Sequence, residues 1–184
     1  IEGVITDKTK AICIINPGNP TGKVLTQEEM QLIVDIAIKH DLFIIADEVY
    51  REFTYDGKEM ATFGAFKEAE QHVIIVDSVS KRFSACGARI GCLVCKNKEY
   101  MAQVYKIAMG RLCVPTLDMV GAEAMYKLPA DFFVDVKAEY EHRRDTAYEA
   151  LMKIPGVVCQ KPGGAFYITA KMPVESTEDL LLFL

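Results

Sequence analysis

The sequence has no run of apolar residues as long as the roughly 20 that a membrane-spanning helix needs, because Asp or Lys interrupts the longer apolar stretches. It also has no excess of positive charge, since 21 Lys and Arg residues stand against 26 Asp and Glu residues and give a net charge of −5. Nucleic-acid binding needs concentrated Lys and Arg to contact phosphates, and the sequence contains no basic cluster. We therefore expect neither a membrane nor a nucleic acid as a partner.

Internal repeats and low-complexity linkers are absent as well, and so are the G-x-G-x-x-G fingerprint and the P-loop of nucleotide-binding domains. A plain nucleotide-binding domain therefore has no support in the sequence. The 184 residues are 51% hydrophobic and 26% charged, which is typical of a globular chain with a substantial core. This composition excludes a disordered or fibrous protein.

The six cysteines are spread through apolar segments, which predicts buried free thiols and a reducing compartment, the cytoplasm. They are Cys13, Cys86, Cys92, Cys95, Cys113 and Cys159. Cys92 and Cys95 form a C-x-x-C, but the residues between them favour a strand, on which positions three apart face opposite sides. Such a pair cannot share a metal ion, so no metal site is expected.

Short apolar runs predict strands of a sheet that is covered on its faces. The candidate strands are residues 11–15, 42–46, 73–76 and 92–95. After the first of them, Thr26 and Glu29 have the spacing of a capping box. The apolar residues that continue at helical spacing from there are Met30, Ile33, Val34 and Ala37. Strand, helix and strand in this order predict an α/β fold with a mostly parallel sheet and helices on both faces.

The second half of the sequence predicts two helices, over about 115–128 and 130–154, and then strands over 157–159 and 165–170. On the longer helix, we expect Arg143 and Arg144 to face water. We place the domain boundary inside this helix, with an α/β domain over 1–138 and the beginning of a smaller α+β domain over 139–184. The sequence starts without Met and stops inside a predicted helix, so we expect it to be a piece of a longer protein.

Polar side chains gather where the predicted strands end. Asn19 comes four residues after the first strand, Asp47 directly follows the second, and Ser78 comes after the third. In open α/β sheets, ligands bind outside the carboxyl ends of the strands. We therefore expect these side chains to lie near one edge of the sheet.

Four motifs carry a resemblance to a known family. They are Asn16-Pro17-Gly18-Asn19-Pro20-Thr21-Gly22, Asp47-Glu48-Val49-Tyr50, Ser78-Val79-Ser80-Lys81 with Gly87-x-Arg89-x-Gly91, and Pro162-Gly163-Gly164-Ala165-Phe166-Tyr167. In this order and spacing, the sequence resembles the pyridoxal-phosphate-dependent aminotransferases of fold type I, class I/II, and in particular their aspartate aminotransferase branch. The resemblance covers nearly the whole chain. It implies that residues 1–138 are the C-terminal part of the cofactor-binding large domain.

The resemblance implies pyridoxal 5′-phosphate as the cofactor, which serves as an electron sink for amino-acid chemistry. Lys81 would hold it through a Schiff base and, once released, move the α-proton of the substrate. Asp47 would face the pyridine nitrogen, and Tyr50 and Asn19 would hydrogen-bond the phenolic oxygen. These assignments make Lys81, Asp47 and Tyr50 the predicted catalytic residues.

The phosphate of the cofactor would be bound by Arg89, whose planar guanidinium can make paired charge-assisted bonds. Ser78 and Ser80 would donate their hydroxyls to the same group. Glu48 and Arg51, which flank the second motif, are interpreted as structural charges with no role in the site.

The implied activity is transfer of an amino group between an amino acid and a 2-oxo acid, with aspartate and 2-oxoglutarate as the first candidate pair, in a homodimer. Two alternatives stay open: a β-lyase or decarboxylating relative on the same scaffold, and an aminotransferase-like sensor domain of a transcription regulator. The family's substrate-carboxylate arginine and part of its phosphate site lie outside this sequence. We therefore expect the 184-residue chain alone to be inactive and to bind the cofactor poorly.

Overall fold

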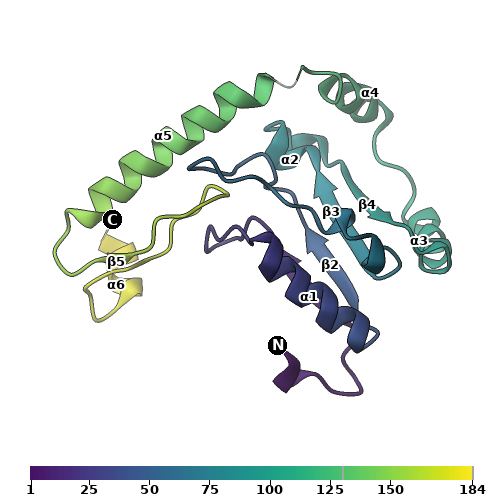
Figure 1. Ribbon diagram of the computed structural model, residues 1–184. Helices are drawn as coiled ribbons and strands as arrows, with labels where there is room; N and C mark the ends of the chain where they lie inside the picture. The colour runs from purple at the N-terminus through teal and green to yellow at the C-terminus, as the bar shows by residue number, and fades with distance from the viewer. Residues whose placement is uncertain (130, 184) are drawn as a thin grey trace.

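The computed structural model of the protein describes residues 1–129 and 131–183. A four-stranded sheet lies in its first half (Figure 1), with the strands side by side in chain order. The strands are β1 (Ala11–Ile15), β2 (Phe43–Asp47), β3 (Val73–Ser78) and β4 (Gly91–Cys95). Strand β2 is parallel to both β1 and β3, whereas β4 is antiparallel to β3. The predicted α/β fold with a mostly parallel sheet is confirmed.

Two strands reach further toward their carboxyl ends than the apolar runs predict. Asp47 pairs with Ile15, and Ser78 pairs with Gly91, so each polar residue is the last of its strand rather than a residue beyond it. Pairing continues because it joins backbone groups, whatever the polarity of the side chain. Both side chains are thereby fixed at the edge of the sheet.

Helix α1 (Gln27–Lys39) begins with the predicted capping box. The Thr26 hydroxyl accepts a hydrogen bond from the Glu29 N–H at 3.2 Å, and the Glu29 carboxylate accepts one from the Thr26 N–H at 2.9 Å. The buried residues of the helix are the four predicted ones: Met30, Ile33, Val34 and Ala37. They pack in one cluster with Ile44 of β2 and with Phe63, so the helix covers the sheet with its apolar side.

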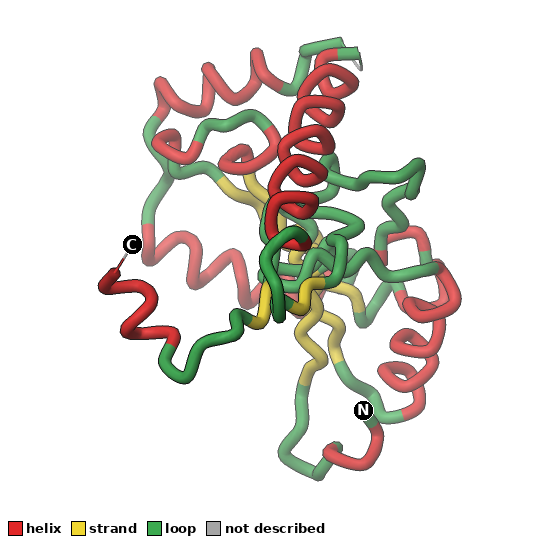
Figure 2. The backbone as a smooth tube through the Cα atoms, turned by 90° about the vertical axis from the view of Figure 1, so that its left-hand side faces the viewer, coloured by secondary structure: helices red, strands yellow, loops and turns green. Residues whose placement is uncertain are grey.

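The second half contains most of the remaining helices and a two-stranded ladder. These elements are α3 (Lys98–Arg111), α4 (Thr116–Met125), α5 (Phe132–Met152), β5 (Val158–Cys159), β6 (Ala170–Lys171) and α6 (Thr177–Phe183). Figures 1 and 2 show α5 as a long rod that leads from α4 to the β5–β6 ladder. The predicted limits at residues 130 and 184 lie outside the described residues. The domain boundary expected between 138 and 139 falls within α5 and stays a prediction.

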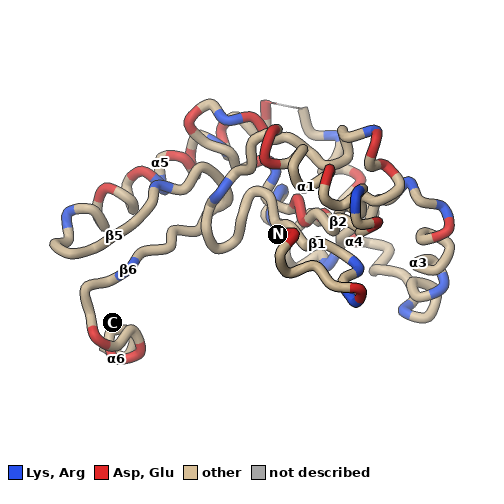
Figure 3. Tube along the Cα trace, turned by 60° about the horizontal axis from the view of Figure 1, so that its bottom comes forward, with Lys and Arg blue, Asp and Glu red and all other residues tan. Residues whose placement is uncertain are grey.

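Short helical turns fill the connections of the first half. They are η1 (Glu2–Val4), η2 (Phe63–Ala65), η3 (Lys67–Ala69), α2 (Val79–Arg82) and η4 (Cys86–Ala88). Within the described ranges, no helix combines the length and the apolar character that crossing a membrane requires. Acidic and basic residues are both spread over the trace in Figure 3.

The strand expected over 165–170 is wrong, since only Ala170–Lys171 is extended and paired, with β5. Ala165 has a φ of +56°, a left-handed conformation that a strand cannot contain. Its N–H donates to the Phe53 carbonyl at 2.9 Å, so the segment crosses the connection after β2 instead of continuing the ladder.

The expectation that Arg144 faces water is also wrong, because this residue is only 5% exposed. It lies on the side of α5 that contacts Asp56, whose carboxylate receives two hydrogen bonds from the guanidinium, at 2.7 and 3.0 Å. Its neighbour Arg143 is exposed, as predicted.

The thiols are free, but the prediction that they are buried is wrong. Cys13, Cys86, Cys92 and Cys113 are exposed, and Cys95 and Cys159 are half-buried. Two of them, Cys13 and Cys92, lie on β1 and β4, the outer strands of the described sheet. An outer strand has a neighbour on one side only, so its side chains are covered less than those of β2 and β3.

Candidate functional site

A cavity of about 420 Å³ lies at the carboxyl ends of β1, β2 and β3. All seven predicted site residues line it: Asn19, Asp47, Tyr50, Ser78, Ser80, Lys81 and Arg89. Its wall also contains four residues that the sequence analysis did not assign: Ile15, Val49, Cys86 and Tyr167. The structure thus brings side chains from all four motifs to one place.

Asn19 is held by the turn that follows β1. The turn is anchored by Asn16, which is buried and accepts a hydrogen bond from the Leu25 N–H at 3.0 Å. It closes at Gly22, whose φ is +66° and whose absent Cβ would meet the Cβ of Pro162 at 2.2 Å. Only glycine fits at this position, because the first and the last motif touch there.

Asp47 and Tyr50 both follow from the end of β2. One carboxylate oxygen of Asp47 accepts the Val49 N–H at 3.1 Å, which fixes the side chain in the wall of the cavity. Tyr50 is buried, and its ring meets those of Phe166 and Tyr167 edge-on at 5.1 and 5.5 Å. Its hydroxyl lies 2.5 Å from the Tyr167 hydroxyl. The tyrosine therefore joins the sheet to the last motif.

Lys81 lies on α2, the four-residue turn that begins directly after β3. The Ser78 hydroxyl accepts the Ser80 N–H at 3.3 Å and so caps this turn. Arg82 pairs with Asp77 at 2.5 Å and ties the turn back to the strand. Among the described residues, the Lys81 amine has no hydrogen-bond or ion-pair partner, although it lines the cavity. It is the free amine of the site.

Arg89 follows η4 in a left-handed conformation, with a φ of +54°. Its guanidinium donates one hydrogen bond, to the Cys86 carbonyl at 3.0 Å. Gly91, two residues later, lies so close to β3 that a Cβ would meet the Asp77 carbonyl at 3.1 Å. This close approach brings the cation of Arg89 to the wall that Ser78 also lines.

Burial and charge set the protonation of two groups at this edge. Burial raises the pKa of the Tyr50 hydroxyl, and its hydrogen bond with Tyr167 raises that pKa further. Burial likewise raises the pKa of the Asp77 carboxyl, while the Arg82 guanidinium acts in the opposite direction. The phenol therefore stays protonated and remains a hydrogen-bond donor.

Tyr167 is the site residue that the sequence reasoning missed. It belongs to the Pro162–Tyr167 motif, which was the available signal, but the motif does not say which of its side chains reaches the sheet. It contacts Tyr50 across 117 residues of sequence. Only the folded chain shows this contact.

Comparison with known proteins settles the family. The sequence model described as "Aminotransferase class I and II" matches residues 1–182. The chain belongs to this family. Among its members, the chain is 35% identical over 170 residues to the aspartate aminotransferase of Bacillus subtilis, an alignment that covers 91% of this chain and 43% of that protein. It is 32% identical over 182 residues to the glutamate-pyruvate aminotransferase of Haemophilus influenzae, covering 95% of this chain and 45% of that protein.

Solved structures of aminotransferases have the same fold. The alanine aminotransferase of Pyrococcus furiosus superimposes with a TM-score of 0.88 at 33% identity, over 98% of this chain and 48% of that one. The aspartate aminotransferase of Thermotoga maritima gives a TM-score of 0.87 at 28% identity, over 99% of this chain and 48% of that one. The chain thus spans less than half the length of the family members it matches.

Proposed function

We propose that the protein is an aminotransferase, which moves an amino group from an amino acid to a 2-oxo acid with the help of pyridoxal 5′-phosphate. The observation that carries this proposal is the cavity at the sheet edge, which gathers all seven residues that the family resemblance marks. Family membership supports it further.

The residues of the cavity fit this cofactor by their chemistry. The cofactor combines a phosphate, a pyridine nitrogen, a phenolic oxygen and an aldehyde. Arg89 with the hydroxyls of Ser78 and Ser80 suits the phosphate, and the carboxylate of Asp47 suits a protonated ring nitrogen. The volume of about 420 Å³ lies within the range of small-molecule sites.

The hydroxyl of Tyr50 and the amide of Asn19 suit the phenolic oxygen, because both carry N–H or O–H donors. The amine of Lys81 has no partner among the described residues, so it is available for attachment to the cofactor. When bound, the cofactor supplies an electron sink for the charge left when an amino acid loses its α-proton.

The residues of this chain then have separate tasks. The Lys81 amine would accept the α-proton of the substrate and give it back, as a general base and acid. The Asp47 carboxylate would stabilise a protonated ring nitrogen of the cofactor. Arg89, Ser78 and Ser80 would bind its phosphate and so orient it in the cavity.

Aspartate and 2-oxoglutarate are the first substrate pair to test, because the relatives include aspartate aminotransferases. We further propose a homodimer, since α3, α4 and the connection between them expose large apolar side chains that a second copy would cover: Ile107 on α3, Leu112 in the connection and Leu117 on α4. The free thiols favour a cytoplasmic location.

The test uses the full-length protein with pyridoxal 5′-phosphate. Borohydride reduction and peptide mass mapping should find the cofactor on Lys81, and a coupled assay should detect amino-group transfer to 2-oxoglutarate. Lys81→Ala should lower kcat by about 10²–10⁴-fold or more, the usual size of a lost general acid–base group. Lys67→Ala, an exposed lysine of η3 outside the cavity wall, is the matched control.

Product analysis separates the alternatives. Release of ammonia or carbon dioxide in place of transfer would identify a lyase or decarboxylating relative, and labelling of another lysine would overturn the assignment of Lys81. The 184-residue chain expressed alone should be inactive, because it spans less than half the length of its relatives.

A further inference from the structure

The closest polar contact in the wall of the cavity joins two tyrosines. The hydroxyls of Tyr50 and Tyr167 lie 2.5 Å apart, and both residues line the cavity. Their rings are nearly perpendicular, at 86°, so the contact is made by the hydroxyls at the tips and not by stacked faces. The proposed function gives Tyr50 a task but leaves Tyr167 without one.

The backbone before Tyr167 is held from both sides. The N–H groups of Gly163 and Gly164 both donate to the Gly22 carbonyl at 2.9 Å, in the turn after β1. The Ala165 N–H donates to the Phe53 carbonyl at 2.9 Å, in the connection after β2. Two connections of the sheet thus set the position of this segment.

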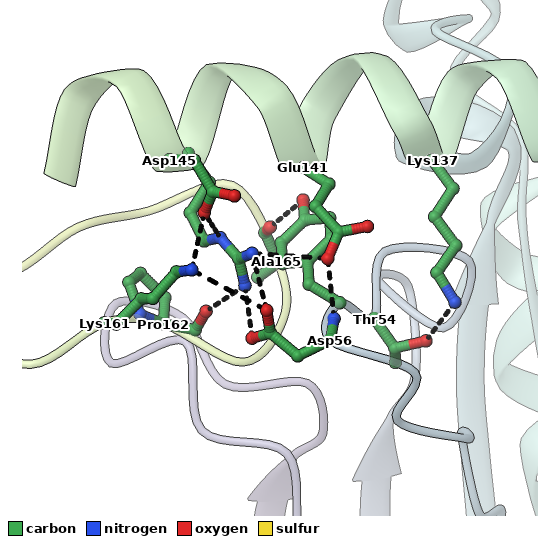
Figure 4. Close-up of polar contacts among 10 residues, drawn as sticks. Thr54, Asp56, Lys137, Glu141, Asp145, Lys161, Pro162 and Ala165 are labelled. Atoms are coloured by element: carbon green, nitrogen blue, oxygen red, sulfur yellow. Dashed lines mark hydrogen bonds and ion pairs between the residues drawn. The ribbon is translucent and has the colours of Figure 1, made fainter. Parts of the chain in front are cut away.

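Ion pairs fix the same segment to α5 (Figure 4). Arg144 donates to the Pro162 carbonyl at 3.0 Å and to the Asp56 carboxylate, and Lys161 lies 2.9 Å from the Asp145 carboxylate. The Tyr55 hydroxyl donates to the Ala165 carbonyl at 2.5 Å. With so many partners on the preceding residues, Tyr167 is placed by the fold rather than by a free loop.

The number of protons on the two hydroxyls decides the direction of the Tyr50–Tyr167 hydrogen bond once a ligand is bound. Either hydroxyl can donate to the other when the cavity is empty. Each tyrosine has one proton, so a ligand oxygen that accepts from Tyr50 leaves Tyr167 as the donor to Tyr50. A donor that also accepts a hydrogen bond is polarised and donates more strongly, by roughly 10–30%.

Other groups of the cavity wall act on the ionisation of the Tyr50 hydroxyl. The charge of Asp47 disfavours ionisation of the Tyr50 hydroxyl, whereas Asn19 acts in the opposite direction through its amide. The cations of Lys81 and Arg89 line the same cavity. Since Tyr50 stays protonated, its one proton is available for a ligand only if Tyr167 does not require it.

We propose that Tyr167 is a positioning residue of this site, whose hydroxyl donates to Tyr50 and directs the Tyr50 proton to the phenolic oxygen of the cofactor. This inference rests on the proposed function for the identity of the ligand. The hydroxyl pair itself is a feature of the protein without any ligand.

The first measurement needs no cofactor. Tyr50→Phe, Tyr167→Phe and the double variant are compared with the parent by thermal unfolding of the cofactor-free full-length protein. Because both single variants break the same hydrogen bond, the double variant should lose less in Tm than the two single losses added together. Additive losses would show that the two hydroxyls do not interact.

The second measurement follows the visible absorption of the bound cofactor against pH. Donation to the phenolic oxygen stabilises its anion, so loss of the donor raises the midpoint of the titration. Tyr50→Phe should raise it by about 1–2 units, the equivalent of one charge-assisted hydrogen bond. Tyr167→Phe should raise it by roughly 0.1–0.6 units, since it removes only the polarisation.

The decisive comparison is Tyr167→Phe in the Tyr50→Phe background, where it should add no shift because Tyr167 acts through Tyr50. Tyr148→Phe, a tyrosine of α5 outside the cavity wall, is the control and should leave the midpoint unchanged. An unchanged midpoint in Tyr167→Phe, or the same shift without Tyr50, would overturn the proposal. If the parent shows no visible band, the proposed function has failed, and the Tm comparison still reports on the pair.

Discussion

Two clusters of buried side chains differ in the type of residue that forms them. The cluster between α1 and the sheet is mainly aliphatic, with Met30, Val34 and Ile44 completely buried. The cluster between α5 and the connection after β2 is aromatic, with Tyr50, Phe53 and Tyr55 as members, and it adjoins the ion pairs of Arg144. The first needs only apolar volume, whereas the second needs each donor to meet its acceptor.

The difference shows how the cavity is assembled. Asp47 and Ser78 end β2 and β3, two strands that pack in the aliphatic cluster, and Ser80 and Lys81 follow β3 directly. Asn19 lies on the turn after β1, and Arg89 lies just before β4. Tyr50 belongs to the aromatic cluster although it follows β2, and Tyr167 packs against that cluster from the last motif. A change in the aliphatic cluster should therefore unfold the site. A change at the junction, by which we mean the contacts of Arg144 with Asp56 and Pro162 beside the aromatic cluster, should displace one wall of the cavity.

Met30→Ala tests the aliphatic cluster and should have the largest effect. Met30 is fully buried, so the shortened side chain leaves a cavity, and the free energy of unfolding should fall by about 2–5 kcal/mol. Leu32 lies on the same helix and is 63% exposed, so Leu32→Ala should change the free energy of unfolding by less than about 0.5 kcal/mol. Urea denaturation measures both, and equal losses would contradict the division into a buried and an exposed side.

Arg144→Met tests the junction and should have the next largest effect. The change removes hydrogen bonds to Asp56 and to the Pro162 carbonyl, and the free energy of unfolding should fall by about 1.5–3 kcal/mol. The matched control is Arg143→Met, whose side chain is 63% exposed and pairs with Glu139, with an expected loss below about 1 kcal/mol. High salt should reduce the difference between the two losses in free energy of unfolding only slightly, because Arg144 is shielded from solvent. If high salt removed this difference completely, the Arg144–Asp56 ion pair would behave as a surface pair.

The buried residues of the aliphatic cluster could be predicted from the sequence, whereas the contacts of the junction could not. The capping box and the four buried positions of α1 are spaced within one helix, so local periodicity contains the information. Arg144 is buried by Asp56, 88 residues earlier in the chain, and its own helix gives no sign of this contact. The strand expected near Ala165 fails likewise, because the distant Phe53 carbonyl accepts its N–H.

The motifs predicted more of the candidate site than periodicity alone could. Asp47 and Ser78 follow from strand ends, but Lys81 and Arg89 reach the same cavity through a four-residue turn and a left-handed residue. Neither feature has a periodic signal. Their roles stay predictions until the lysine and the arginine are tested.

Glu48→Gln sharpens the comparison at the border of the aliphatic cluster and should have the smallest effect. The Glu48 carboxyl is completely buried and accepts hydrogen bonds from Thr62 and from the Phe63 N–H, and burial raises its pKa. The folded state therefore binds the Glu48 proton more tightly than the unfolded state does. Its contribution to the free energy of unfolding should fall as pH rises from the ordinary carboxyl pKa to the raised value.

The measurement is the difference in free energy of unfolding between the parent and Glu48→Gln, across a pH range from about 4 to 8. Gln keeps the acceptor oxygen and carries no titrating proton, so the difference isolates this one group from the exposed carboxylates. The parent should lose stability relative to the variant as pH rises. A difference that stays constant with pH would show that Glu48 titrates alike in both states.

The contact between Tyr50 and Tyr167 also bears on the order in which the cavity is assembled during translation. The two residues are 117 positions apart, and at about 5–20 residues per second the ribosome needs roughly 6–23 s to add the second after the first. Parallel strands that are distant in sequence pair more slowly than hairpins, in roughly milliseconds to seconds, which still lets the strand ends pair before Tyr167 is added. The rate of translation, and not the rate of folding, therefore sets the time at which Tyr167 completes the cavity wall.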